Sequence, residues 1–137
     1  MRVILCANTS WYLWNFRRGL IKELLGRGWD VILVMPDQRY SKIFENLGCK
    51  VVRISMDNKG LNPLRELQTL WHLYSTYRKH RPMFAYHFTV KPTIYGSLVG
   101  GWLGVKCINT ITGLGTAFIG ARYFRVIVSF LYRRVRN

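Results

Sequence analysis

Three segments of the sequence carry side chains able to bind a polar ligand, and each directly follows a short apolar run. The first, residues 8–15, joins short hydrogen-bonding groups to large aromatic rings: Asn8, Ser10, Trp11, Tyr12, Trp14 and Asn15. Aromatic faces beside polar groups suit stacking on a sugar ring, although Trp11 and Trp14 would equally serve as anchors to a core. Arg17 and Arg18 follow and face either a phosphate or solvent. The glycines of a dinucleotide-binding fingerprint are missing from this segment, which argues against NAD or FAD.

The second segment, residues 87–92, contains His87 and Lys91. His87 follows or ends an apolar run, whereas the other two histidines fall on or just after a long amphipathic segment. A neutral imidazole would accept a hydroxyl proton, and a protonated one would pair with phosphate. The alternative is a structural histidine. If His87 is catalytic, replacing it should lower turnover or acceptor affinity and change stability little.

The third segment offers Thr112, Gly113 and Gly115, where glycines would let backbone amides approach a ligand. The sequence has no CxxC, no P-loop and no G-x-S-x-G motif. It has no paired carboxylates at the ends of apolar runs, which disfavours hydrolysis by two acids. We therefore expect no metal site and no bound cofactor.

The elements that position these segments alternate along the chain. Continuous apolar runs at residues 3–7, 31–34, 51–54, 84–88 and 107–111 predict buried strands. Helical spacing predicts helices over residues 14–27, 41–47, 62–78, from Pro92 onward, and 121–135. This alternation predicts an α/β fold, a three-layer, Rossmann-like doubly wound parallel sheet with strand order 3-2-1-4-5. The three segments would then line one crevice around the first and fourth strands.

Charge points to an anionic partner. The net charge is +15, and ten Lys and Arg follow the last acidic residue, Glu66. In the last predicted helix, a basic stripe faces an apolar remainder: Arg122, Arg125, Arg133 and Arg136. That pattern is typical of a helix lying on an anionic membrane surface. The alternative is that the apolar face packs on the sheet or on another domain.

Several blocks agree in order and spacing with one known family. Residues 8–20, NTSWYLWNFRRGL, resemble the opening of family 4 glycosyltransferases of the GT-B fold, in particular bacterial enzymes that add N-acetylhexosamines to undecaprenyl-diphosphate-linked sugars. The later blocks SMD (55–57), KGLNPL (59–64), HFTVKP (87–92), YGS (95–97) and NTITGLG (109–115) are similar as well. Many family members have a His just after the fifth strand, where this chain has Thr112.

The resemblance implies that residues 1–137 form one N-terminal domain that binds a lipid-linked saccharide acceptor. It also implies that the donor-binding C-terminal domain, which holds the nucleotide sugar, is absent. Transfer would proceed with retention, without a metal, on the inner face of the cytoplasmic membrane. His87 would be catalytic, and Asn8, Ser10, Trp11, Tyr12, Asn15, Lys91, Thr112, Gly113 and Gly115 would bind the acceptor.

Two other classes remain open. The chain would be a non-catalytic or split-enzyme acceptor subunit that works with a separate donor-binding subunit. A basic nucleic-acid-binding module would also explain the charge, but the sequence contains no helix-turn-helix, RNA-binding aromatic motif or zinc finger to support it.

Overall fold

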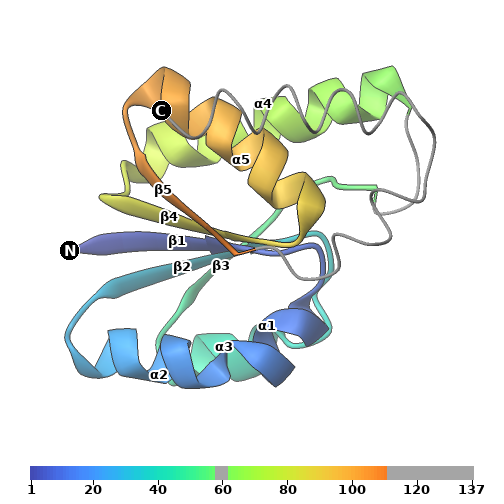
Figure 1. Cartoon of the computed structure of the whole chain (residues 1–137). Helices are drawn as coiled ribbons and strands as arrows, with labels where there is room; N and C mark the ends of the chain where they lie inside the picture. The colour runs from blue at the N-terminus through green and yellow to red at the C-terminus, as the bar shows by residue number, and fades with distance from the viewer. Residues whose placement is uncertain (58–61, 111–137) are drawn as a thin grey trace.

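A five-stranded parallel sheet forms the centre of the computed structural model, which describes residues 1–57 and 62–110 (Figure 1). Its strands are β1 (Arg2–Cys6), β2 (Asp30–Met35), β3 (Lys50–Arg53), β4 (Phe84–Phe88) and β5 (Lys106–Thr110). The strand order is β3-β2-β1-β4-β5, and every neighbouring pair is parallel. The predicted fold class and strand order are confirmed.

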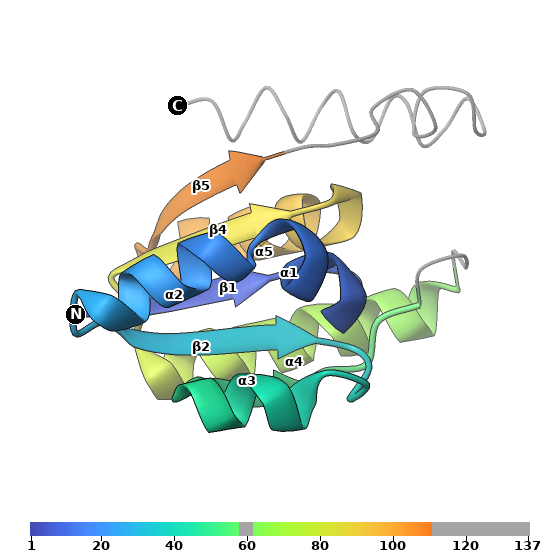
Figure 2. The ribbon, with the colours of Figure 1, turned by 90° about the horizontal axis from the view of Figure 1, so that it is seen from below.

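Helices cover both faces of this sheet, so the domain has three layers. One face carries α1 (Ser10–Phe16), α2 (Arg18–Gly26) and α3 (Ser41–Leu47), and the other carries α4 (Pro63–His80) and α5 (Val90–Leu103) (Figures 1 and 2). The chain runs from β1 outward to β3 and then returns to β4 on the other side of β1. The carboxyl ends of β1 and β4 therefore mark the point where the winding direction changes, and ligands of open α/β sheets bind at such points.

The central strands β1 and β2 are apolar after their first residue, and both of their faces are buried. In β1, Val3 and Leu5 belong to the core beneath α1–α3, while Ile4 and Cys6 belong to the core beneath α4 and α5. The three cysteines are unpaired thiols: Cys6 and Cys49 are buried and Cys107 is half-buried.

Two predicted helices differ from the observed ones. The helix expected over residues 14–27 is in fact α1 and α2, separated at Arg17, which has φ −123° and ψ 4°. α1 begins at Ser10 because the Thr9 side chain accepts a hydrogen bond from the amide of Tyr12. α5 begins at Val90, two residues before Pro92. The helix expected over residues 121–135 lies outside the described residues.

Close packing of α5 on the sheet depends on glycines without side chains. A Cβ atom at Gly96 would lie 2.3 Å from His87 Nε2, and one at Gly100 would lie 2.2 Å from Cys107 Sγ.

α4 begins as predicted, with Asn62 accepting from the amide of Leu64 and Pro63 in the first turn. Together α4 and α5 fix the positions of the polar groups that follow β3 and β4.

Candidate functional site

The carboxyl edge of the sheet gathers the segments that follow β1, β2 and β4. Residues 7–9 lead from β1 into α1, Pro36 and Asp37 follow β2, and Thr89 joins β4 to α5. Sequence reasoning expected the β1, β4 and β5 segments to line one crevice. The structure brings the first two together at the β1–β4 boundary. β5 ends at Thr110, and the candidates of the third segment, Thr112, Gly113 and Gly115, lie outside the described residues, as do Arg122, Arg125, Arg133 and Arg136.

Ser10 holds the loop after β1 against the end of β2. Its amide donates to Asp37 Oδ2 at 2.8 Å, and its hydroxyl donates to Asp37 Oδ1. The amide of Arg39 donates to the same carboxylate at 3.2 Å. Burial opposes ionisation of Asp37, but the hydrogen bonds from Ser10 and Arg39 outweigh it and lower the pKa of this carboxyl.

Ser10 is therefore fully buried and committed to Asp37. Its contact with an acceptor stays a prediction. Sequence reasoning missed Asp37, although an acid directly after Pro36 at a strand end was the signal that could have found it.

The aromatic residues of α1 divide into buried and exposed groups. Tyr12 is buried, and its ring centroid is 6.0 Å from that of Phe88 at the end of β4. Trp14 packs on Tyr40 and Phe44, so it is an anchor. Trp11 is 47% exposed and meets Phe16, itself 60% exposed, edge to face at 5.6 Å.

The remaining polar candidates of this segment are less buried. Asn15 is exposed and its amide nitrogen donates to the carbonyl of Trp11 at 2.9 Å. Asn8 is half-buried at the strand end. The exposed surface of α1 thus offers Trp11, Phe16 and Asn15 side by side at the carboxyl edge.

His87 does not face the crevice. Its side chain is 0% exposed and lies under α4 and α5, with Nε2 at 2.6 Å from the Tyr77 hydroxyl and Nδ1 at 2.8 Å from Asn109 Oδ1. Because an amide oxygen only accepts, Nδ1 carries the proton and Nε2 accepts from Tyr77. Asn109 in turn donates to Ser97 at 3.0 Å.

Burial lowers the pKa of His87 to about 4, against a smaller opposing effect of the Asn109 hydrogen bond. At neutral pH the ring is uncharged and both nitrogens are occupied. The catalytic role expected of His87 stays a prediction, and in this structure both of its ring nitrogens are bonded within the chain. Side chains of β4 alternate between the two faces of the sheet, and that of His87 falls on the face covered by α4 and α5. His87 is also paired in register with Asn109 on β5.

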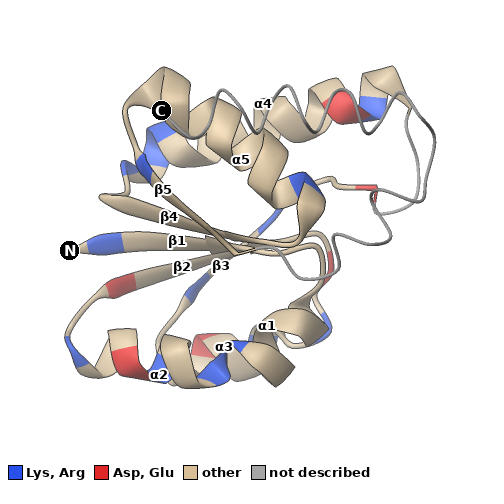
Figure 3. Ribbon diagram, in the orientation of Figure 1, with Lys and Arg blue, Asp and Glu red and all other residues tan. Residues whose placement is uncertain are grey.

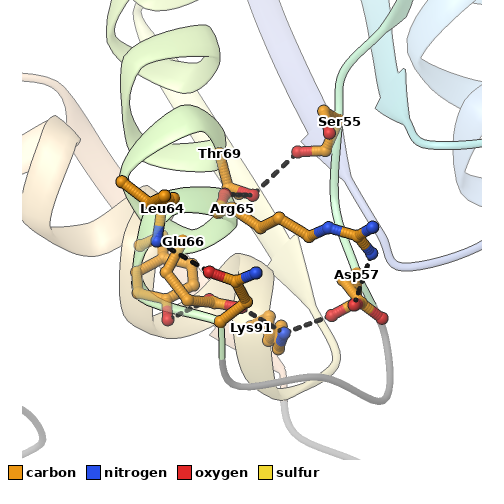
Figure 4. A network of polar contacts seen from close by, with 9 residues as sticks. Ser55, Asp57, Leu64, Arg65, Glu66, Thr69 and Lys91 are labelled. Atoms are coloured by element: carbon orange, nitrogen blue, oxygen red, sulfur yellow. Dashed lines mark hydrogen bonds and ion pairs between the residues drawn. The ribbon is translucent and has the colours of Figure 1, made fainter.

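Lys91 is also engaged within the chain. Its amino group lies 2.8 Å from Glu66 Oε1 and donates to the carbonyl of Asp57, and the Tyr95 hydroxyl donates to Glu66 Oε2 (Figure 4). The side chains of Lys91 and Glu66 are only 11% and 14% exposed. Arg65 pairs with Asp57 at 3.1 Å, so this network ties the end of β3, the start of α4 and the start of α5 together.

Desolvation, followed by the contact with Glu66, raises the pKa of Tyr95 well above its usual value. Tyr95 therefore stays a neutral donor. Lys91 forms a nearly buried ion pair in this arrangement, and its contact with an acceptor stays a prediction.

Within residues 1–57 and 62–110, no group of three or more His, Cys, Asp or Glu side chains is placed to hold a metal ion. The helices of this part of the chain include none long and apolar enough to cross a membrane.

Comparison with known proteins places this geometry in context. An N,N'-diacetylbacillosaminyl-diphospho-undecaprenol α-1,3-N-acetylgalactosaminyltransferase of Campylobacter jejuni is 24% identical over 138 residues, which cover 97% of this chain and 37% of that enzyme. The chain thus spans little more than a third of the length of this relative.

Solved structures share the fold at lower identity. MurG of Acinetobacter baumannii matches 81% of this chain and 34% of its own, at 12% identity and a TM-score of 0.63. A glycosyltransferase of Rickettsia africae matches 79% of this chain and 28% of its own, at 14% identity and a TM-score of 0.66. A UDP-N-acetylglucosamine 2-epimerase matches 96% of this chain and 40% of its own, at 12% identity and a TM-score of 0.66, so the fold alone does not specify sugar transfer.

The decisive match is to a family model that covers nearly the whole chain. The model described as Glycosyl transferase 4-like covers residues 2–137. This range includes the residues of the loop after β1, of the network around His87 and of the Lys91 ion pair. The chain belongs to the glycosyl transferase 4-like family.

Proposed function

We propose that this chain binds the acceptor in a retaining glycosyltransferase that moves a sugar, an N-acetylhexosamine, from a nucleotide sugar to a lipid-linked saccharide. The nucleotide sugar would bind a second domain or a separate subunit. The site would lie at the carboxyl edge of the sheet, where the exposed aromatic surface of α1 meets the end of β4.

The observation that carries this proposal is the match to an enzyme whose name specifies transfer of N-acetylgalactosamine to an undecaprenol-linked diphospho-sugar, over 97% of this chain. The structure adds a surface of suitable chemistry. Trp11 and Phe16 present aromatic faces and Asn15 an amide at the edge where α/β sheets bind ligands.

An exposed apolar stripe supports work at a membrane surface. Leu64, Leu67 and Trp71 lie three and four residues apart on α4 and are exposed. They belong to the first half of α4, which begins beside the carboxyl edge of the sheet. With a net charge of +15, such a stripe suits an anionic lipid surface, and the enzyme would act on the inner face of the cytoplasmic membrane.

The direct test is reconstituted transfer. The chain is combined with its donor-binding half, and a labelled UDP-N-acetylhexosamine is supplied with a short-chain prenyl-diphosphate-linked saccharide. We expect transfer only when both halves are present, with the anomeric configuration of the donor retained in the product by NMR. Inversion of configuration would contradict the retaining mechanism, and no transfer with any lipid-linked acceptor would contradict the function.

Sedimentation with vesicles tests the membrane part separately. We expect binding to vesicles that contain anionic lipid, little binding to neutral vesicles, and weakening as salt screens the charges. Equal binding to neutral vesicles, or tighter binding to nucleic acid, would favour another partner. Calorimetry of the 137-residue chain with UDP-sugars is expected to show affinities no tighter than roughly millimolar, about −4 kcal/mol.

A further inference from the structure

Arg17 places a guanidinium at the boundary between β1 and β4. The residue lies in the break between α1 and α2, and its side chain turns back over the last residue of β4. The guanidinium carbon is 4.6 Å from the centroid of the Phe88 ring and 5.8 Å from that of Tyr12. Phe88 is 1% exposed, so the guanidinium lies over a ring that is held in place by the core.

The hydrogen-bonding capacity of Arg17 is largely unused within the described residues. A guanidinium has five donors, and the structure gives it one side-chain partner, the Tyr12 hydroxyl, at 3.1 Å from Nη2. Its Nε is buried and has no partner in the described part of the chain.

Figure 3 shows where the basic and acidic residues lie along the ribbon. The ion pairs of the described residues engage Arg2, Arg27, Lys50, Arg65 and Lys91, and none of them includes Arg17. A half-buried cation without an anion is costly for the folded state. A ligand anion would remove that cost.

Thr89, the residue directly after Phe88, carries a second unsatisfied group. Its φ of 73° and ψ of 170° lie in a region that essentially only glycine adopts, and its Oγ1 is buried without a partner among the described residues. Backbone strain of this kind collects at ligand sites. Thr89 also precedes the first turn of the 14-residue helix α5, whose amino terminus favours negative charge.

We propose that Arg17 binds the diphosphate of the lipid-linked acceptor, with Phe88 and the Tyr12 hydroxyl holding the plane of its guanidinium. This assignment rests on the proposed function. A planar guanidinium with free donors forms paired hydrogen bonds to phosphate oxygens, which a lysine does not reproduce. Trp11 and Asn15, on the exposed side of α1, would then contact the saccharide that the diphosphate carries.

The test measures binding to the 137-residue chain by calorimetry. Four ligands separate the possible sources of the diphosphate: inorganic pyrophosphate, farnesyl-diphosphate-linked N-acetylglucosamine, the uncharged farnesyl glycoside of the same sugar, and UDP-N-acetylglucosamine. The variants are Arg17→Gln, Arg17→Lys and, as a matched control, Arg18→Gln. Arg18 is exposed, and its guanidinium lies 4.7 Å from the Trp14 ring.

Arg17→Gln is expected to weaken binding of the farnesyl-diphosphate sugar about 10- to 100-fold, and Arg18→Gln less than about threefold. Arg17→Lys should give an intermediate loss, because it keeps the charge without the planar donors. The uncharged glycoside should bind all variants alike. Urea unfolding checks that each variant is folded. If Arg17→Gln does not fold, the comparison is made with Arg17→Lys.

Three results would overturn the assignment. Equal losses for Arg17→Gln and Arg18→Gln would show a general charge effect, and an equal loss for the uncharged glycoside would show a structural role. Arg17-dependent binding of UDP-N-acetylglucosamine alone would assign the residue to the donor. If the wild-type chain binds pyrophosphate through Arg17 but not the lipid-linked sugar, the anion site stands and the proposed function fails.

Discussion

The two sides of the β1–β4 boundary differ in how their long basic side chains are engaged: Lys91 on the α5 side is paired with Glu66, whereas Arg17 on the α1 side is in no ion pair of the described residues. On the α5 side, His87, Lys91, Tyr95, Ser97 and Asn109 are all bonded to other residues of the chain. On the α1 side, Trp11 and Phe16 are exposed, and Arg17 keeps a buried donor without a described partner. Both sides contain residue types that bind ligands, so residue type alone does not identify the site.

The difference lies in whether the fold has already satisfied each group. A buried polar group that is fully hydrogen-bonded contributes to a unique structure and has little left to offer a ligand. The α5 side thus holds the end of β4 in position, and the α1 side carries the groups that a ligand can still contact. Perturbing each side should therefore give different signatures, stability on one and binding on the other.

The largest effect is expected from Glu66→Ala, which leaves the nearly buried Lys91 without its carboxylate and the Tyr95 hydroxyl without its acceptor. We expect a loss of about 3 kcal/mol in the free energy of unfolding, measured in urea. Glu23→Ala is the matched control, because the Glu23–Arg27 pair at 2.8 Å is exposed and should contribute less than about 0.5 kcal/mol. Similar losses for both variants would mean that the Lys91 pair is not a support.

Acidification should weaken the same side through His87. Its pKa is about 4 in the folded state and about 6.5 when unfolded, so below pH 6.5 the unfolded chain takes up a proton that the folded chain does not. The stabilisation is complete above pH 6.5 and is lost as the pH falls toward 4, by on the order of 3 kcal/mol.

Two measurements check this. NMR should show the His87 ring unprotonated down to about pH 4, and the loss of stability should be smaller in His87→Gln. The titratable group bonded to the ring, the Tyr77 hydroxyl, does not titrate in this range, because burial raises its pKa well above its usual value. A ring that protonates near pH 6.5 would contradict the buried network. His87→Ala is now expected to reduce stability, contrary to the expectation from sequence.

Gly96→Ala should cost about 2 kcal/mol, because its Cβ would meet the fixed His87 ring at 2.3 Å. The control lies on the same helix: a Cβ added at Gly101 would have nothing within 4 Å, and Gly101→Ala should be neutral or stabilise by up to about 1 kcal/mol. Thermal unfolding of the two variants makes the comparison. If Gly96→Ala is tolerated as well as Gly101→Ala, α5 does not pack on His87 as described.

The smallest effect is expected on the α1 side and in binding. Trp11→Ala should leave stability within about 0.5 kcal/mol and lower affinity for the lipid-linked saccharide about fivefold, or ~1 kcal/mol. Trp102→Ala is the control, since Trp102 is an exposed tryptophan near the C-terminal end of α5, away from the carboxyl edge of the sheet. Acceptor titrations of both variants separate a sugar contact from a general loss of aromatic surface. Equal affinities would remove Trp11 from the site.

Sequence predicted the sheet well because its signals are local. Continuous apolar runs located every strand to within about one residue, and the alternation with helices gave the strand order. The break at Arg17 was missed because the apolar spacing continues across it.

Side-chain partners were missed for a different reason. Ser10 meets Asp37 across 27 residues, Lys91 meets Glu66 across 25, and His87 meets Asn109 across 22. These distances in sequence close only when the sheet forms, so no spacing rule indicates them. Candidate residues could be chosen by type from the sequence, but which of them remain free for a ligand follows from the fold.

The rates at which the buried thiols are alkylated would report how parts of the sheet unfold. Burial raises the pKa values of Cys49 and Cys107 to about 11, so little reactive thiolate exists at neutral pH while the fold is closed. Cys107 lies on the edge strand β5, whereas Cys6 lies in β1 between β2 and β4. Alkylation of Cys107 therefore times the detachment of one strand, and alkylation of Cys6 times the separation of the whole sheet.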